Sequence, residues 1–134
     1  MIKIKEKTKA KEMSEEQEKL KERLSHIRHT IMVMSGKGGV GKSTVAANLA
    51  AALARQGYAV GVLDGNMHGP NIPLIMGVEG RPLMGDEEGN MLPVEVYKNL
   101  SLVSVGNLLQ NRDQPVVWRG PVKHTVMRHF LANV

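Results

Sequence analysis

The spacing of apolar residues predicts first an amphipathic helix over residues 14–28. Ser14 and Gln17 have the spacing of a capping box, which is typical of a helix start. The apolar residues of this segment recur at intervals of three or four and define one face: Leu20, Leu24 and Ile27.

The next apolar segments predict a strand, a helix and a second strand. Thr30 to Met34 is a short apolar run with β-branched members, which is typical of a buried parallel strand. Ser43 to Gln56 is predicted as a helix that Gly57 ends, and Tyr58 to Leu63 as the second strand. The predicted packing face of the helix consists of Val45, Ala46, Leu49, Ala52 and Leu53. Two strands joined in this way are expected to be parallel, with a right-handed crossover.

The periodic spacing of apolar residues becomes less clear after Asp64, where the stretch GNMHGPNIPLIMGVEGRP is rich in Gly and Pro. It predicts a loop over the carboxyl ends of the strands, with one helical turn. Residues Asp86 to Asn90 predict a turn between short extended pieces, and Leu100 to Val105 a third core strand. A last helix is predicted to start at Pro121. Its apolar face consists of Val122, Val126 and Phe130.

The composition limits what these elements can form. A length of 134 residues allows one domain at most, or part of one. With 42% hydrophobic and 23% charged residues and no apolar run near the roughly 20 residues that span a bilayer, we expect a cytoplasmic protein without membrane contact. The first residues contain no apolar core of a secretory signal. The chain contains no cysteine, which excludes disulfides and thiolate metal ligands from these residues.

The net charge of +5 is concentrated at the amino-terminal end. Residues 1–29 hold nine Lys and Arg against six Glu, with lysines at alternate positions from 3 to 11. Because no aromatic residues are interleaved with these lysines, a solvated basic arm is favoured over a nucleic-acid contact. We therefore expect a basic arm and helix over 1–29 and one α/β unit over 30–134.

The stretch from Gly36 to Thr44, GKGGVGKST, carries the clearest chemistry in the chain. It matches the phosphate-binding pattern G-x-x-x-x-G-K-[ST] and lies between a predicted strand and a predicted helix. Glycines let backbone N–H groups point at phosphate oxygens, and the helix adds the positive end of its dipole. Lys42 is placed to reach the β- and γ-phosphates, and Ser43 to ligate Mg²⁺. The predicted nucleotide-binding residues are Gly36, Lys37, Gly38, Gly39, Val40, Gly41, Lys42, Ser43 and Thr44.

A second lysine in this loop, Lys37, is not required by the general pattern. With it, GKGGVGKST resembles the deviant Walker A motif of the ATPase group that contains nitrogenase iron protein and the Min, Par and Mrp/ApbC proteins. The resemblance implies that residues 30–134 are the amino-terminal part of an α/β P-loop ATPase domain, with a mostly parallel sheet flanked by helices. It also implies a homodimer, in which Lys37 reaches the nucleotide of the partner subunit. The alternative is an exposed lysine on an anion-binding loop. A positive charge here could stabilise charge on a transferring phosphoryl group.

Two further stretches narrow the resemblance to one branch of that group. VLDGNMHGPNIPLIMG and VVWRGPVKHTVMRHFL look like the HGPN loop and the WRGP helix of the Mrp/ApbC, or Nbp-type, iron-sulfur cluster carriers. The resemblance covers about residues 28–134 and implies ATP and Mg²⁺ as cofactors and iron-sulfur acceptor proteins as partners. Two alternatives stay open: a Par/Min-type partitioning ATPase, and a non-catalytic nucleotide-binding fragment.

The resemblance also assigns roles at the end of the second strand. Asp64 corresponds to the first aspartate of the family's D-x-D and is expected to hold a water on Mg²⁺, acting in catalysis with Lys37 and Lys42. Asn66 stands where the second aspartate is expected. An asparagine can hydrogen-bond the attacking water but cannot accept its proton. His68 is interpreted as a loop hydrogen-bonder rather than a metal ligand.

The family continues beyond this point with elements that these 134 residues do not contain. They are the strand with the Walker B aspartate, a glycine switch, a C-x-x-C cluster motif and the residues that hold the adenine. A cluster is therefore expected only in the full-length family context, and ATP hydrolysis by these residues alone is left open. Because the Walker B strand would lie beside the phosphate-loop strand, we expect an open sheet edge and exposed apolar surface there.

Overall fold

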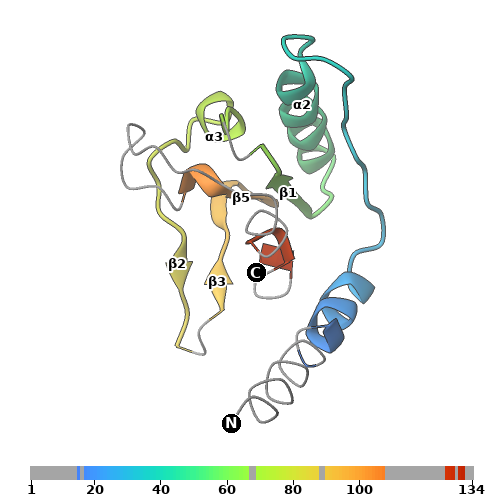
Figure 1. The fold of residues 1–134 in the computed structure, drawn as a ribbon, viewed down its shortest axis with the longest axis vertical. Coiled ribbons are helices and arrows are strands. Elements are labelled where there is room, and N and C mark those ends of the chain that lie inside the picture. The colour runs from blue at the N-terminus through green and yellow to red at the C-terminus, as the bar shows by residue number, and fades with distance from the viewer. Residues whose placement is uncertain are drawn as a thin grey trace, which may run out of the picture.

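The computed structural model describes residue 15 and residues 17–66, 69–87, 90–107, 126–128 and 130–131. Its elements are α2 (Lys42–Arg55), β1 (Val60–Asp64), α3 (Ile72–Ile75), β2 (Met84–Gly85), β3 (Met91–Leu92), β4 (Val94–Tyr97), β5 (Leu100–Ser104) and the 3-10 turn η1 (Val105–Asn107) (Figure 1). Residues 17–25, 126–128 and 130–131 are also helical. Among the described residues, no helix combines the length and apolar character needed to cross a membrane.

Three strands form the main sheet, in the order β1-β5-β4. β1 and β5 are parallel, and Asp64 lies opposite Ser104 at their carboxyl ends. β4 is antiparallel to β5, so the sheet is mixed. β2 and β3 pair separately as a short antiparallel hairpin, which confirms the turn predicted at Asp86 to Asn90. The predicted strands near 58–63 and 100–105 are thus present as β1 and β5, whereas β4 was not predicted.

The core lies on both faces of β5, because successive strand residues point to opposite sides. Leu100 and Leu102 pack with Val62 on the face covered by α2 and α3. Val103 points the other way and packs with Phe130, which is 2% exposed. Helical residues therefore cover both sides of the sheet, as expected of an α/β fold. The apolar face predicted for the last helix is confirmed at Phe130, while Pro121 and Val122 lie outside the described residues.

Helix α2 packs through alanines rather than through its larger apolar residues. Its buried side chains are those of Ala47, Ala50 and Ala54. The packing face predicted from the sequence is wrong at Val45, Leu49 and Ala52, all of which are exposed. Small side chains let the helix backbone approach β1 and β5 closely, which turns the bulkier face away from the sheet. Gly57, with φ of 94°, ends the helix as predicted.

The strand predicted at Thr30 to Met34 is absent, so the predicted parallel pair with the following strand is wrong. This segment is extended but unpaired and runs outside α2, away from the sheet (Figure 1). Three of its large side chains are exposed: Ile31 at 60%, Met32 at 76% and Met34 at 77%. A buried parallel strand needs hydrogen-bonded neighbours and cover on both faces, and the described part of the chain supplies neither at this segment. Among the described residues β1 and β4 are the two edge strands, and the edge of β1 is the one that the absent strand leaves open.

The helix predicted over 14–28 is helical at residues 17–25, and Ser14 lies outside the described residues. Its predicted apolar face is largely exposed, with Leu24 at 41% and Ile27 at 49%. The single helical turn predicted after Asp64 is confirmed as α3.

Candidate functional site

The loop before α2 turns through two glycines in the left-handed region. Gly39 has φ of 77° and Gly41 has φ of 88°, values that residues with a side chain rarely adopt. A Cβ added at either glycine would meet no atom within 4 Å, so the space beside the loop is open. Glycine is needed at these positions for the direction of the backbone rather than for close packing.

The same loop leads directly into the amino-terminal end of α2. Gly41 is the N-cap residue and provides no side-chain cap, and the first turn contains no acidic residue. The first helical hydrogen bond runs from the Val45 N–H to the Gly41 carbonyl at 2.9 Å. The N–H groups before Val45 therefore have no partner within the helix. Together with the helix dipole they form an end that favours a bound anion.

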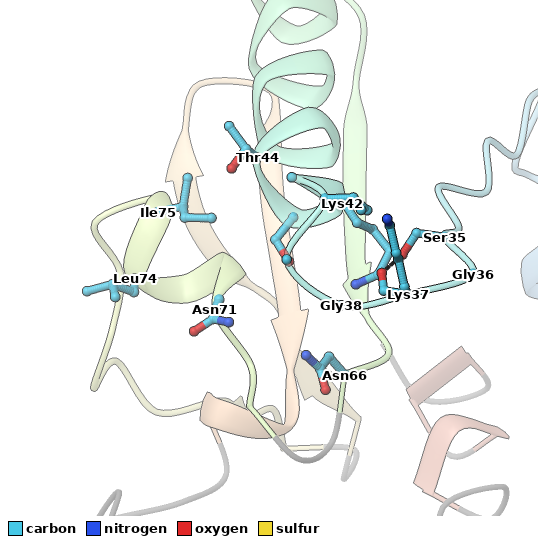
Figure 2. A pocket seen from close by; sticks show the side chains of 14 residues that line it. Ser35, Gly36, Lys37, Gly38, Lys42, Thr44, Asn66, Asn71, Leu74 and Ile75 are labelled. Atoms are coloured by element: carbon cyan, nitrogen blue, oxygen red, sulfur yellow. Dashed lines mark hydrogen bonds between the residues drawn. The ribbon is translucent and has the colours of Figure 1, made fainter.

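A cavity of about 700 Å³ lies over this loop. Its volume is within the range of about 300–1,000 Å³ that is usual for small-molecule sites. All nine residues predicted to bind nucleotide line it, with Ser35 and four residues from the other side: Asn66, Asn71, Leu74 and Ile75. Figure 2 shows the loop lysines and the α3 side chains on opposite sides of this space. The cavity thus joins a polar, glycine-rich wall to a partly apolar one.

Asp64 lies at the end of β1, 4% exposed, and accepts hydrogen bonds from several elements. Its Oδ1 accepts the backbone N–H of Asn66 at 3.0 Å, and its Oδ2 accepts the Ser104 hydroxyl at 3.4 Å. Burial raises the pKa of Asp64, although hydrogen bonds from the backbone N–H groups of Asn66 and Ile72 act against that rise. The positive charge of Lys42 also lowers this pKa, because the ammonium stabilises the charged form of the Asp64 carboxyl group.

Asn66 lines the cavity and also braces the loop that follows β1. Its side-chain Nδ2 donates to the Gly69 carbonyl at 2.8 Å. A carboxylate has no proton to donate to that carbonyl and would place two acceptors together. Asparagine at this position therefore has a structural use that an aspartate would lack.

The structure brings together most of the predicted site residues. Asp64 is an exception, because it is not among the residues that line the cavity. Sequence reasoning did not identify Asn71, Leu74 and Ile75 from the α3 region, or Ser104. The only available signal for Ser104 was a polar residue at the end of a predicted strand, which lies near Asp64 if that strand is the parallel neighbour of β1. His68 and the WRGP stretch lie outside the described residues, and within the described ones no three His, Asp or Glu residues converge as metal ligands.

Comparison with known proteins extends these observations. Residues 26–134 match the ParA family described as NUBPL iron-transfer P-loop NTPase. The chain is 46% identical over 124 residues to an iron-sulfur cluster carrier protein from Methanococcus maripaludis, covering 92% of this chain and 43% of the relative. It is 45% identical over 113 residues to a cytosolic Fe-S cluster assembly factor, a Nubp2 homolog from Drosophila simulans, covering 83% of this chain and 43% of that protein.

A solved structure shares both the fold and much of the sequence. It is a nucleotide-binding protein from Archaeoglobus fulgidus in complex with ADP, with a TM-score of 0.73 and 38% identity. The match covers 87% of this chain and 43% of that one. The chain therefore has a P-loop nucleotide-binding fold and spans less than half the length of these relatives.

Proposed function

The chain belongs to the family of NUBPL iron-transfer P-loop NTPases, and from this membership we propose that its glycine loop binds the phosphates of Mg²⁺-ATP. The carrying observation is the cavity of about 700 Å³ that all nine loop residues line. The left-handed Gly39 and Gly41 and the uncapped start of α2 support an anion at this position. We propose that the protein acts as an ATP-linked iron-sulfur cluster carrier, as the names of its relatives support.

The donor groups of the site fit Mg²⁺, which prefers oxygen ligands and is often held by one or two carboxylates together with substrate phosphates. Ser43 offers a hydroxyl in the first turn of α2, and Asp64 offers a carboxylate through a water molecule. When bound, Mg²⁺ neutralises charge that develops on phosphate oxygens. Lys42 is half-buried beside the loop, where its ammonium can donate to the β- and γ-phosphates. Thr44 is expected to support the α-phosphate.

We propose a homodimer through the loop face, in which Lys37 reaches the nucleotide of the partner subunit. Lys37 lines the open cavity and is exposed in the single chain, so its ammonium is free to meet a second copy. ATP hydrolysis is then proposed at this interface. The cluster itself requires ligands beyond these residues, because the chain has no cysteine. We also propose that the protein is cytoplasmic and that it transfers its cluster to iron-sulfur acceptor proteins.

Nucleotide binding is tested by calorimetry with Mg²⁺-ADP and Mg²⁺-ATP on the wild-type chain and on Lys42→Ala. Loss of charge-assisted hydrogen bonds to phosphate, each about 1.5–3 kcal/mol, should weaken binding on the order of 10- to 100-fold. Lys98→Ala is the matched control, since it removes the same charge from an exposed turn between β4 and β5. Equal affinity of the wild type and Lys42→Ala would contradict phosphate binding at this loop.

A non-catalytic nucleotide-binding role is the second candidate, and the bond from Asn66 to Gly69 favours it. Measuring the rate of phosphate release separates the two candidates. Four proteins are compared: this chain and a version extended with the second half of a relative, each with Asn66 and with Asn66→Asp. If the missing carboxylate limits turnover, Asn66→Asp in the extended chain should raise the rate about 100-fold or more. The same change should lower thermal stability, because it removes the bond to Gly69. Full turnover by the extended chain that retains Asn66 would exclude the non-catalytic role.

A further inference from the structure

A buried serine stands beside Asp64 at the carboxyl end of β5. Ser104 is 0% exposed, and it lies opposite Asp64 in the register of the parallel strands. The Ser104 hydroxyl oxygen accepts the backbone N–H of Gly106 at 3.1 Å. That bond uses an oxygen lone pair, so the hydroxyl can donate its proton at the same time, and it donates to Asp64 Oδ2 at 3.4 Å.

We propose that Ser104 is a positioning residue for Asp64, and that its hydroxyl fixes the plane of the Asp64 carboxylate, which accepts a hydrogen bond from the cavity-lining Asn66. This inference rests on the proposed function. The Asn66 N–H holds Oδ1 from the loop that directly follows β1. The Ile72 backbone N–H is a second donor, and it belongs, like Asn66, to the segment that follows β1. Ser104 is the donor from another strand, so its bond ties the carboxylate to β5 as well. The lone pairs that remain are then kept in one direction for a water on the metal.

A close contact ties the Ser104 turn to the cavity wall. A Cβ added at Gly106 would lie 2.9 Å from Pro70 Cγ and 3.5 Å from Ser104 Oγ. The end of β5 and the loop leading to α3 are therefore packed against each other, with no room for a methyl group. Since Asn71 follows Pro70 and lines the cavity, the turn that orients Ser104 cannot move independently of that wall.

A purely structural role for Ser104 makes a different prediction from a positioning role. At 3.4 Å the bond to Asp64 is long compared with the usual value of about 2.8 Å for O–H···O. Its contribution to folding stability is accordingly small. A bond that orients a group next to a metal site acts instead on the affinity for metal. Loss of a partner of a direct metal ligand typically costs about 10- to 100-fold, so about 10-fold is the largest effect expected for Asp64, which acts through a water molecule.

The test measures ADP affinity by calorimetry in Mg²⁺ and in EDTA, and takes the ratio of the two dissociation constants as the Mg²⁺ enhancement. The variants are Ser104→Ala, Asp64→Ala and the double variant, with Ser104→Thr to restore the hydroxyl. Ser101→Ala is the matched control, because it makes the same change on β5 opposite Gly61. We expect Ser104→Ala to lower the enhancement about 10-fold without changing affinity in EDTA, and Ser104→Thr to recover it. In the Asp64→Ala background, Ser104→Ala should have no further effect.

Different outcomes separate this inference from the proposed function. An enhancement that Ser104→Ala leaves at the wild-type value would overturn the positioning role alone. A loss that persists in the Asp64→Ala background would also overturn it, because Ser104 would then act on the site by another route. Absence of ADP binding by the wild type would overturn the proposed function, and the inference with it. If Ser104→Ala does not fold, Ser104→Cys replaces it, because a thiol has nearly the volume of the hydroxyl group but is a weak hydrogen-bond donor. The Mg²⁺ enhancement of Ser104→Cys should then be lower than that of the wild type, and an unchanged enhancement would overturn the positioning role.

Discussion

Two glycines at opposite ends of α2 allow the effect of backbone strain to be separated from the effect on ligand binding. Gly41 precedes the helix with φ of 88°, and Gly57 follows it with φ of 94°. A Cβ at either position meets no atom within 4 Å. Gly41→Ala and Gly57→Ala therefore introduce the same methyl group into the same backbone conformation, and only the first lies in the cavity lining.

The cost to stability follows from the left-handed conformation alone. A residue with a Cβ loses about 1–2 kcal/mol in that region, and no clash adds to this because the surrounding space is open. For a chain of 134 residues, this corresponds to a decrease in Tm of roughly 3–10 °C. Both variants should show it. In Gly41→Ala, relief of the strain also turns the N–H groups of the loop away from the phosphates, so nucleotide affinity should fall at least about 10-fold.

The assay pairs thermal unfolding of the ligand-free chain with calorimetric titration by Mg²⁺-ADP. Gly57→Ala should retain the wild-type dissociation constant while losing the same stability as Gly41→Ala. Two results would refute this reasoning. Equal affinities in the two variants would show that the loop conformation does not govern binding. A much larger stability loss in Gly41→Ala would show that the space beside it is not open.

Three further predictions concern Asp64, the last helical residues and the cluster. Burial raises the pKa of Asp64, so the folded state binds the carboxyl proton more tightly than the unfolded chain does. The stability that this proton contributes is complete below the pKa of the unfolded chain and is lost as the pH rises through the raised pKa of the folded state. Asp64→Asn should remove this pH dependence and raise Tm at pH 7 without metal, and an unchanged pH profile of thermal unfolding would count against it. Phe130→Ala should cost about 3–5 kcal/mol in urea unfolding, because Phe130 is 2% exposed and packs with Val103 and Val105; a loss below about 1 kcal/mol would show that this packing is not part of the core. Anaerobic reconstitution with iron and sulfide should produce no cluster absorption on this chain, since it has no cysteine, and a stoichiometric cluster would contradict that.

The sequence predicts well those features that depend on local backbone chemistry. The helix beginning at Lys42 and ending before Gly57 follows from a glycine at each end and a run of helix-forming alanines. The nine loop residues line one cavity because they are contiguous, so their placement needs no tertiary information. The hairpin at Asp86 follows from turn-forming residues, and Asp86 Oδ1 accepts the Asn90 N–H at 2.8 Å.

Features that depend on neighbouring elements are where the predictions fail. An apolar, β-branched run such as Thr30 to Met34 becomes a strand only beside a partner strand, and periodicity does not reveal whether one is present. Val45 was predicted on the packing face of the helix, yet close approach of α2 to the sheet selects the alanine face. Ser104 was missed because its role depends on register with Asp64, which a single strand pattern does not contain.

The central claim is that nucleotide phosphates bind in the glycine loop. Titration of ¹⁵N-labelled chain with Mg²⁺-ADP, followed by amide chemical shifts, tests it residue by residue. We predict that the largest shifts fall on the N–H groups of residues 36–44 and on Asn66, and that Lys42→Ala reduces them at the same nucleotide concentration. Saturable shifts confined to other parts of the chain, with the loop amides unmoved, would contradict it.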